Sequence, residues 1–374
     1  MRSLGAFSAL FLIVASVSAF SARGSALSAR AEKPDNGESG FCRCSHSSLW
    51  LNIIFVVDVS SSMTKGGVEQ AESLIQSTLN ELSLGRDAFQ SQVAVISYAS
   101  FANIAYDFNH LRTAEDVANF TLPYTGDNAT DINNGLSEVI YDPMFTVPGR
   151  DARTVVVLIA SSYDDRRHDP VPTADMIKNT IGQIITVEFL QPGGSPVPIL
   201  RDIASPGYTF SSLNQEITAS TILDALCQTN CFCPPSKSFY STNSQNTPDG
   251  GCFDIFPGRI THVGAQIACS FDNGTLPTVH DDGVQTFLAS LLPPKTPYWI
   301  GLDKLSGEYA WVDSVDYSSS YQNWASGEPS SAGACVVARQ YRGFQSGWFA
   351  TDCSDTQSYI CQSRPCDSTY DCLA

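Results

Sequence analysis

Residues 51–62 constrain this chain more than any other stretch, because an apolar run ends there in oxygen-bearing side chains. The run Leu-Asn-Ile-Ile-Phe-Val-Val is typical of a strand buried on both faces of a parallel sheet. Asp58, Ser60 and Ser62 follow, and then apolar residues at helical spacing from Val68 to Leu82. Ligands bind at such strand-to-helix edges, and hard divalent cations prefer oxygen ligands. The pattern also fits a polar turn in which Ser62 lies near a helix N-cap.

Between residues 45 and 228, apolar runs alternate with segments of helical spacing. We expect strands at 92–100, 103–108, 153–161, 183–189 and 207–211, and helices at 113–120, 131–141, 172–180 and 213–227. Such alternation predicts a mostly parallel sheet with helices on both faces, which is a doubly wound, Rossmann-like α/β fold.

The N-terminus has the features of a secretory signal peptide. Arg2 precedes the apolar run 10–15, and Val17-Ser18-Ala19 predicts cleavage after Ala19. That run is too short to span a bilayer, and no later run reaches about 18 apolar residues, so we expect a secreted, extracellular chain without a membrane anchor. Twelve cysteines suit an oxidising compartment. Sequons then predict glycosylation at Asn119, Asn128 and Asn273.

The cysteines and the composition divide the chain. No cysteine stands between Cys44 and Cys227, and beyond Cys227 the composition turns to Gly, Pro, Ser and Trp. We therefore expect a signal peptide at 1–19, a disordered leader at 20–44, a first domain at 45–228, a second domain at 233–363 and a C-terminal tail at 364–374.

The first domain resembles a von Willebrand factor A domain throughout its length. Asp58, Ser60 and Ser62 match the Asp-x-Ser-x-Ser pattern of that family's metal-ion-dependent adhesion site (MIDAS). Thr130 matches the threonine of the second metal loop by its spacing to Leu136. The resemblance implies that Mg²⁺ or Mn²⁺ is held by Asp58, Ser60, Ser62 and Thr130.

The third metal loop departs from the family pattern. The family supplies an aspartate just after the central strand, whereas this chain has Ser161 there, which weakens charge neutralisation of a divalent ion. Asp164 and Asp165 follow closely, and the sequence leaves open whether either one compensates.

The second domain resembles a C-type lectin-like domain, a disulfide-bonded α+β fold, over its full length. The family's motifs occur in their usual order as Trp299-Ile300-Gly301-Leu302, Asn323-Trp324, Gly327-Glu328-Pro329, Gly347-Trp348 and Tyr359-Ile360-Cys361. Family spacing implies the disulfides Cys269–Cys361, Cys335–Cys353 and, as in the long form of the domain, Cys233–Cys252.

Two cysteines precede the first domain and two follow it, namely Cys42, Cys44, Cys227 and Cys231. Because the termini of a doubly wound domain can lie close together, we expect the first pair to bond with the second, with the partner of each left open. In the tail, Cys366 and Cys372 would close a small loop. Each bridge typically contributes about 2–4 kcal/mol.

The sugar chemistry of the lectin family is only partly retained. Calcium-dependent binding in the family uses Glu-Pro-Asn, an acidic residue two places before a cysteine, and Trp-Asn-Asp. Here these positions hold Glu328-Pro329-Ser330, Gly333 and Trp348-Phe349-Ala350. Because calcium takes about 6–8 oxygens, we expect no calcium site, and we retain Glu328 and Ser330 as candidate ligand-binding residues.

The sequence favours a binding protein over an enzyme. None of the five histidines lies in a nucleophile-elbow or zinc-helix context, and His168 reads as part of a solvated loop, so we predict no enzymatic activity and no catalytic residues. A net charge of −17 argues against nucleic acid and anionic membranes as partners.

The pairing of the two domains resembles secreted nematode C-type lectin-like proteins. That resemblance implies extracellular recognition of a carbohydrate or protein ligand, in innate defence. The alternative is an extracellular matrix or adhesion protein in which both domains are structural. The sequence does not identify the ligand.

Overall fold

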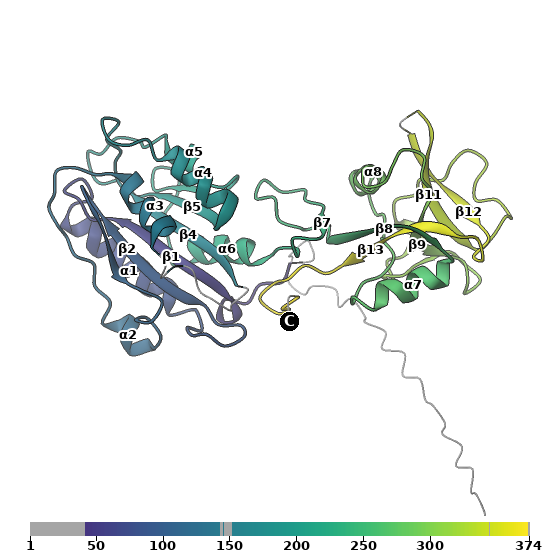
Figure 1. Ribbon diagram of the computed structural model, residues 1–374, viewed down its shortest axis with the longest axis horizontal. Helices are drawn as coiled ribbons and strands as arrows, with labels where there is room; N and C mark the ends of the chain where they lie inside the picture. The colour runs from purple at the N-terminus through teal and green to yellow at the C-terminus, as the bar shows by residue number, and fades with distance from the viewer. Residues whose placement is uncertain (1–41, 143–144, 146–151, 344, 373–374) are drawn as a thin grey trace, which may run out of the picture. The chain divides into compact units, whose positions relative to one another are not determined.

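The computed structural model describes residues 42–142, 145, 152–343 and 345–372 (Figure 1). The predicted signal peptide at 1–19 and the leader up to residue 41 lie outside the described residues. Cys42 and Cys44 are described, and each is disulfide-bonded to a cysteine at the end of the first domain. The end of the predicted leader, residues 42–44, is therefore fixed in place rather than disordered.

The first sheet contains six strands, β1 (Leu51–Asp58), β2 (Gln92–Tyr98), β3 (Ala102–Tyr106), β4 (Arg153–Ala160), β5 (Gly182–Glu188) and β6 (Thr209–Ser211). Their order is β3-β2-β1-β4-β5-β6, and all neighbours are parallel except β2 and β3. The order reverses between β1 and β4, which is the doubly wound topology that the sequence predicts.

Helices cover both faces of this sheet (Figure 1). On one face lie α1 (Lys65–Leu79), α2 (Ala114–Ala118) and α6 (Ala219–Asn230), and on the other α3 (Ile132–Tyr141), α4 (Val171–Thr180) and α5 (Leu200–Ile203). In β1, Phe55 packs in the core on the α1 side, and Ile54 and Val56 pack on the α3 side. Burial on both faces explains why β1 reads as a continuous apolar run.

One predicted helix, at 213–227, begins later than its apolar spacing suggests. The helix α6 starts at Ala219, and Thr218 caps it through a reciprocal capping box with Thr221. Leu213 is largely exposed and lies before the helix. The short helix α5 was not predicted from the sequence.

The second sheet contains β7 (Ser238–Phe239), β8 (Cys252–Ile260), β9 (Tyr298–Asp303), β10 (Ala310–Trp311), β11 (Cys335–Arg342), β12 (Gln345–Thr351) and β13 (Gln357–Ser363). Their order is β12-β11-β9-β13-β8-β7, and β10 pairs with β9. The central strand β9 carries the Trp299-Ile300-Gly301-Leu302 motif.

Two helices pack on this second sheet, α7 (His262–Ser270) and α8 (Asp282–Ser290). Leu288 of α8 shares a core with Ile300, and Ala265 of α7 shares a separate core with Trp299. Because successive side chains of a strand point to opposite faces, α7 and α8 cover opposite sides of β9. Two short 3-10 helices, η1 (His46–Ser48) and η3 (Tyr317–Ser319), complete the described elements.

Candidate functional site

Loops meet at the carboxyl edge of the first sheet, where the strand order reverses. The register pairs Asp58, the last residue of β1, with Tyr98 at the end of β2. The Ser61 amide donates to the carbonyl of Asp127 over 2.7 Å, and the Asp131 amide donates to the carbonyl of Ala99 over 2.9 Å. These bonds bring the first and second predicted metal loops together.

The carboxylate of Asp58 is fully buried at this edge. One oxygen, Oδ1, accepts from the Ser60 amide over 3.0 Å, and Oδ2 accepts from the Ser161 hydroxyl over 2.7 Å. Burial raises the pKa of Asp58, although the hydrogen bonds from Ser161 and Ser60 act in the opposite direction. A cation beside Asp58 would favour its ionised form.

Three buried hydroxyls near Asp58 lack hydrogen-bond partners among the described residues: those of Ser60, Tyr98 and Thr130. Buried polar groups are ordinarily bonded, and oxygen donors of this kind suit Mg²⁺ or Mn²⁺. Asp58, Ser60 and Thr130 therefore fit the predicted metal. Ser62 lies exposed in the turn after β1, and the structure does not bring it into this buried group.

Asp164 is engaged within its own loop. Its carboxylate accepts from Arg166 Nε over 2.8 Å and from Arg166 Nη2 over 3.1 Å, and Arg167 Nε lies 3.8 Å away. Hydrogen bonds from Arg166 lower the pKa of Asp164. Asp165 is exposed. Because Asp164 is bonded to Arg166, it does not replace the aspartate that the family has at the position of Ser161. The sheet edge therefore has one carboxylate fewer than the family pattern.

Sequence reasoning missed two residues at this edge, Asp131 and His168. Asp131 is buried at the N-cap of α3, and its Oδ2 lies 3.0 Å from Nδ1 of His168. His168, expected in a solvated loop, is 74% exposed but contacts Asp131. Asp131 could have been found from its position directly after Thr130 and before the helical pattern that begins at Ile132.

The lectin domain presents a second candidate edge around Glu328. Its Oε2 accepts from the backbone amides of Ser330 over 2.7 Å and Ala350 over 3.0 Å. The peptide bond between Glu328 and Pro329 is cis. The structure therefore brings Glu328 and Ser330 together, but it uses the Glu328 carboxylate to hold its own loop.

The other positions of the family's calcium motifs hold no carboxylate in this chain. A Cβ atom on Gly333 would lie 2.0 Å from the carbonyl oxygen of Thr351, so this position admits only glycine without backbone movement. The guanidinium of Arg339 lies 4.2 Å from the ring centroid of Phe349, and Tyr341 meets the same ring edge-on. An aromatic ring, that of Phe349, thus stands at a position where the family pattern has a ligating oxygen, and the cation of Arg339 lies over it.

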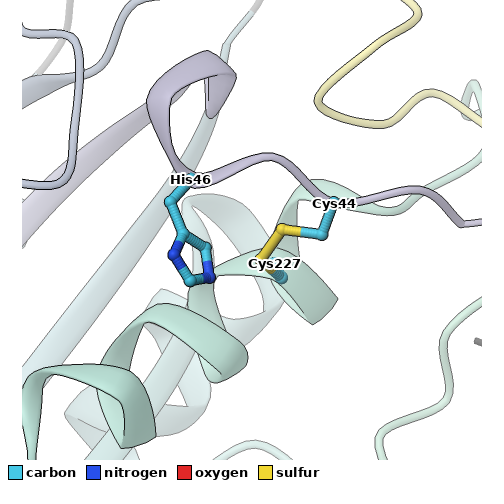
Figure 2. Close-up of side chains that lie close together, drawn as sticks. All are labelled: Cys44, His46 and Cys227. Carbon is cyan, nitrogen blue, oxygen red and sulfur yellow. A yellow bond between two sulfur atoms is a disulfide. The ribbon is translucent and has the colours of Figure 1, made fainter. Parts of the chain in front are cut away.

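All cysteines in the described residues form disulfides. The structure contains the implied pairs Cys233–Cys252, Cys269–Cys361, Cys335–Cys353 and Cys366–Cys372, and it joins Cys42 to Cys231 and Cys44 to Cys227. His46 lies beside the Cys44–Cys227 bridge (Figure 2). Because these two sulfurs bond each other, they offer no thiolate to a metal.

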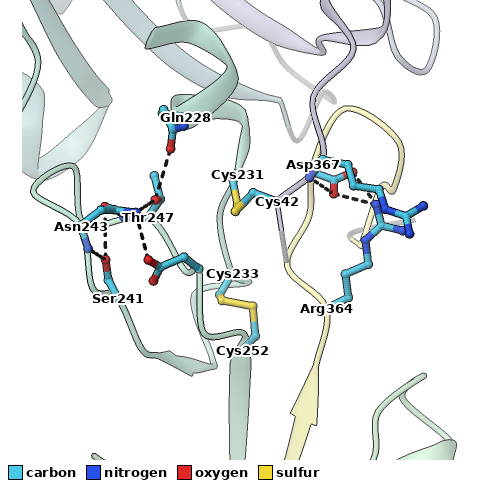
Figure 3. Close-up of a disulfide and its surroundings, with 12 residues drawn as sticks. Cys42, Gln228, Cys231, Cys233, Ser241, Asn243, Thr247, Cys252, Arg364 and Asp367 are labelled. Atoms are coloured by element: carbon cyan, nitrogen blue, oxygen red, sulfur yellow. Dashed lines mark hydrogen bonds and ion pairs between the residues drawn. A yellow bond between two sulfur atoms is a disulfide. The ribbon is translucent and has the colours of Figure 1, made fainter. Parts of the chain in front are cut away.

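The tail does more than close its own loop (Figure 3). Asp367 is buried and accepts from the Arg43 amide over 2.9 Å and from Arg364 Nη2 over 2.8 Å. The indole of Trp50 donates to the Asp367 carbonyl over 2.8 Å. The tail is thus fastened to the segment that leads into β1.

Two family models match this chain. The von Willebrand factor type A domain matches residues 52–224, and the Lectin C-type domain matches residues 259–363. The N-terminal part therefore belongs to the von Willebrand factor type A domains and the C-terminal part to the C-type lectin domains, as the sequence predicts. Both families consist in general of binding domains without catalysis.

C-type lectin domain-containing protein 160 of Caenorhabditis elegans is 28% identical over 366 residues, which cover 90% of this chain and 56% of that protein. The chain thus spans little more than half the length of this relative. The human low affinity immunoglobulin epsilon Fc receptor is 39% identical over 95 residues, 24% of this chain and 28% of the receptor. A solved C-type lectin domain of murine dendritic cell inhibitory receptor 2, in complex with N-glycan, is 24% identical, covers 35% of this chain and 98% of that chain, and has a TM-score of 0.31.

Among the residues that the structure describes, no helix has the length and apolar character needed to cross a membrane. Six disulfides fit an extracellular protein.

Proposed function

We propose that this chain is a secreted recognition protein that binds an extracellular carbohydrate or protein through its C-type lectin domain, without calcium, and that it serves innate defence. The observation that carries this proposal is that the Glu328 carboxylate accepts hydrogen bonds from the backbone amides of Ser330 and Ala350. Gly333 supplies no side-chain oxygen, and calcium takes about 6–8 oxygen ligands, which supports binding without calcium.

The same edge offers a different ligand chemistry. Arg339 is exposed, and its guanidinium lies over Phe349, which is half-buried. A ring and a planar cation together suit the apolar face of a sugar or an acidic group of a ligand. Recognition at this edge accordingly depends on Arg339 and Phe349, with Glu328 and Ser330 shaping the loop beside them.

Secretion is supported by the N-terminal sequence pattern and by the disulfides, and it makes Asn119, Asn128 and Asn273 candidate glycosylation sites. All three asparagines are exposed. We propose no enzymatic activity, because no feature of either edge supplies a nucleophile beside a general base.

In the first domain we propose weak Mg²⁺ or Mn²⁺ binding by Asp58, Ser60 and Thr130, with the exposed Ser62 as a further ligand. Support comes from the unpartnered hydroxyls of Ser60 and Thr130 beside the buried Asp58. When bound, the ion would supply a positive charge to which an acidic group of a protein ligand can bind. Ser161 limits the affinity, because it adds no charge.

The second candidate is an extracellular matrix or adhesion protein. It is favoured by the fastening of the tail to the first domain through Asp367, which suits a structural spacer.

A binding screen separates the two candidates. Full-length protein with intact disulfides is applied to a glycan array, to whole bacteria and to extracellular matrix from animal tissue. Recognition predicts binding to glycans or bacteria that Arg339→Ala and Phe349→Ala weaken, whereas Glu308→Ala, which changes an exposed carboxylate between β9 and β10, does not. Binding to matrix components alone would overturn the proposal in favour of the second candidate.

A further inference from the structure

Phe271 has the largest exposed fraction, 84%, among the exposed large hydrophobic side chains in the described part of the chain. It is the C-cap residue of α7. Val263 and Ile267 precede it at intervals of four residues, so the three side chains lie along one helix face. They are 50% and 54% exposed. An exposed aromatic ring at the end of a helix is stabilised when another group covers it and removes it from water.

A glycosylation sequon begins two residues after Phe271. It is Asn273-Gly274-Thr275. Asn273 is exposed, with a φ of 49°, and its amide donates to the carbonyl of Ser270 over 3.3 Å. The Gly274 amide donates to the carbonyl of Cys269 over 3.0 Å. Phe271 and Asn273 therefore stand exposed on a single tight turn.

The other two sequons lack such a neighbour. Two residues before Asn119 stands Val117, which is buried, and two residues before Asn128 stands Gly126. Phe120, inside the sequon of Asn119, is buried as well. Only the sequon of Asn273 is preceded at this spacing by an exposed aromatic side chain.

We propose that Phe271 is the packing surface for the first N-acetylglucosamine of a glycan on Asn273. A pyranose ring has a face of C–H groups, and the face of an aromatic ring is negative and apolar, so the two attract. Covalent attachment two residues away gives the sugar a high effective concentration at Phe271. The glycan then shields this ring and stabilises the turn at the end of α7. The inference rests on the proposed secretion.

The test is a cycle of variants in full-length protein secreted from cells that make high-mannose glycans. Thr275→Ala removes the sequon and retains Asn273, which tolerates its left-handed backbone better than most residues. The readout is thermal unfolding by tryptophan fluorescence, since four of the five tryptophans lie in the lectin domain, at positions 299, 311, 324 and 348.

We expect Thr275→Ala to lower the unfolding temperature by about 2 °C or more when Phe271 is present, and by less than half as much in the Phe271→Ala background. Endoglycosidase trimming to one N-acetylglucosamine should preserve the stabilisation. The matched control is Ile267→Ala, on the same helix face but a turn away, which should leave the effect of Thr275→Ala unchanged.

Equal losses with and without Phe271, or loss of the effect on trimming or in Ile267→Ala, would overturn the inference. Peptide mass spectrometry measures occupancy in the same material. An unmodified Asn273 would also overturn it, while occupancy at Asn119 or Asn128 would leave the proposed secretion standing. Failure of ligand recognition is measured separately, by the glycan and bacterial binding screen.

Discussion

Ser161 stands where von Willebrand factor type A domains have an aspartate, and its hydroxyl donates to Asp58 Oδ2 over 2.7 Å. The hydroxyl satisfies the buried carboxylate without adding a second negative charge. Two carboxylates in one buried place repel each other, and a divalent cation removes that repulsion. This single residue therefore shifts the edge toward stability without metal and away from tight metal binding.

Ser161→Asp should tighten Mn²⁺ binding by about tenfold, which corresponds to about 1.4 kcal/mol. It should also lower the unfolding temperature of the metal-free protein, because the new carboxylate lies beside Asp58. Calorimetric titration and thermal unfolding with and without Mn²⁺ measure both effects. Asp58→Ala should abolish binding in either background, and unchanged binding in that variant would show that the ion is held elsewhere.

In the lectin domain, the proposed binding without calcium predicts that a carboxylate placed at Gly333 does not create a calcium site. Gly333→Asp should lower the unfolding free energy by about 1–3 kcal/mol through overpacking, because its Cβ would meet the Thr351 carbonyl. It should confer no calcium-dependent stabilisation. Ser330→Asn, at a half-buried position in the same loop, serves as the comparison and should fold normally. A rise in unfolding temperature with calcium in Gly333→Asp would contradict this account.

Among the elements, α7 has an unusual first residue. His262 is fully buried, its ring meets Trp299 edge-on at 5.2 Å, and neither ring nitrogen has a hydrogen bond in the described residues. Burial lowers its pKa, and the negative charge of Asp303 offsets this only in part. The positive end of the helix dipole also disfavours a proton there.

Because the pKa of His262 is lower in the folded protein than its unfolded value of about 6.5, neutral His262 favours the fold above that pH. This contribution is lost as the pH falls below about 6.5. Thermal unfolding should therefore shift downward from pH 7 to pH 5 in the native chain, and less in His262→Leu. Val263→Ala changes a half-exposed, non-titratable side chain on the same helix and should retain the native pH dependence. Identical shifts in His262→Leu and the native chain would refute this role.

The elements that could be predicted best are those with the simplest burial. The strands β1 and β4 are buried on both faces and read as unbroken apolar runs. The start of α6 could not be placed from apolar spacing, because Leu213 matches the helical period while the capping box of Thr218 sets the actual boundary. A cap depends on two side chains and outweighs periodicity locally.

Part of the candidate metal site could also be predicted from sequence position alone. Asp58, Ser60 and Thr130 follow strands or precede a helix, where sequence position alone indicates the sheet edge. The contact between Asp131 and His168 joins residues 37 positions apart through loop geometry. No local pattern specifies such a pairing, and the same holds for the arginines that engage Asp164.

At the scale of the whole molecule, the last described residues, near Asp367, contact the first described ones. Asp367 is buried between the Arg43 amide and Arg364, and Trp50 donates to its carbonyl. The Cys42–Cys231 bridge fixes the same N-terminal segment (Figure 3). Sequence spacing predicted a small tail loop, but Arg43 and Trp50, which also bond Asp367, lie more than 300 positions away, and these contacts were not predictable.

Asp367→Ala should lower the unfolding free energy by about 3 kcal/mol, because it removes the buried carboxylate that pairs with Arg364 and accepts from the Arg43 amide. Chemical denaturation followed by fluorescence measures the change, and Asp355→Ala, an exposed carboxylate in the lectin domain, is the control. A change no larger than that of the control would mean that the tail contributes nothing to stability.

The central claim, recognition by the lectin domain without calcium, is tested most directly by surface plasmon resonance on the carbohydrate that the array identifies. Full-length protein is injected in calcium and then in EDTA. We predict affinities that agree within about twofold, because Glu328 is held by backbone amides and Gly333 and Phe349 offer no ligating oxygen. Binding to mannose or galactose that EDTA abolishes would contradict the claim.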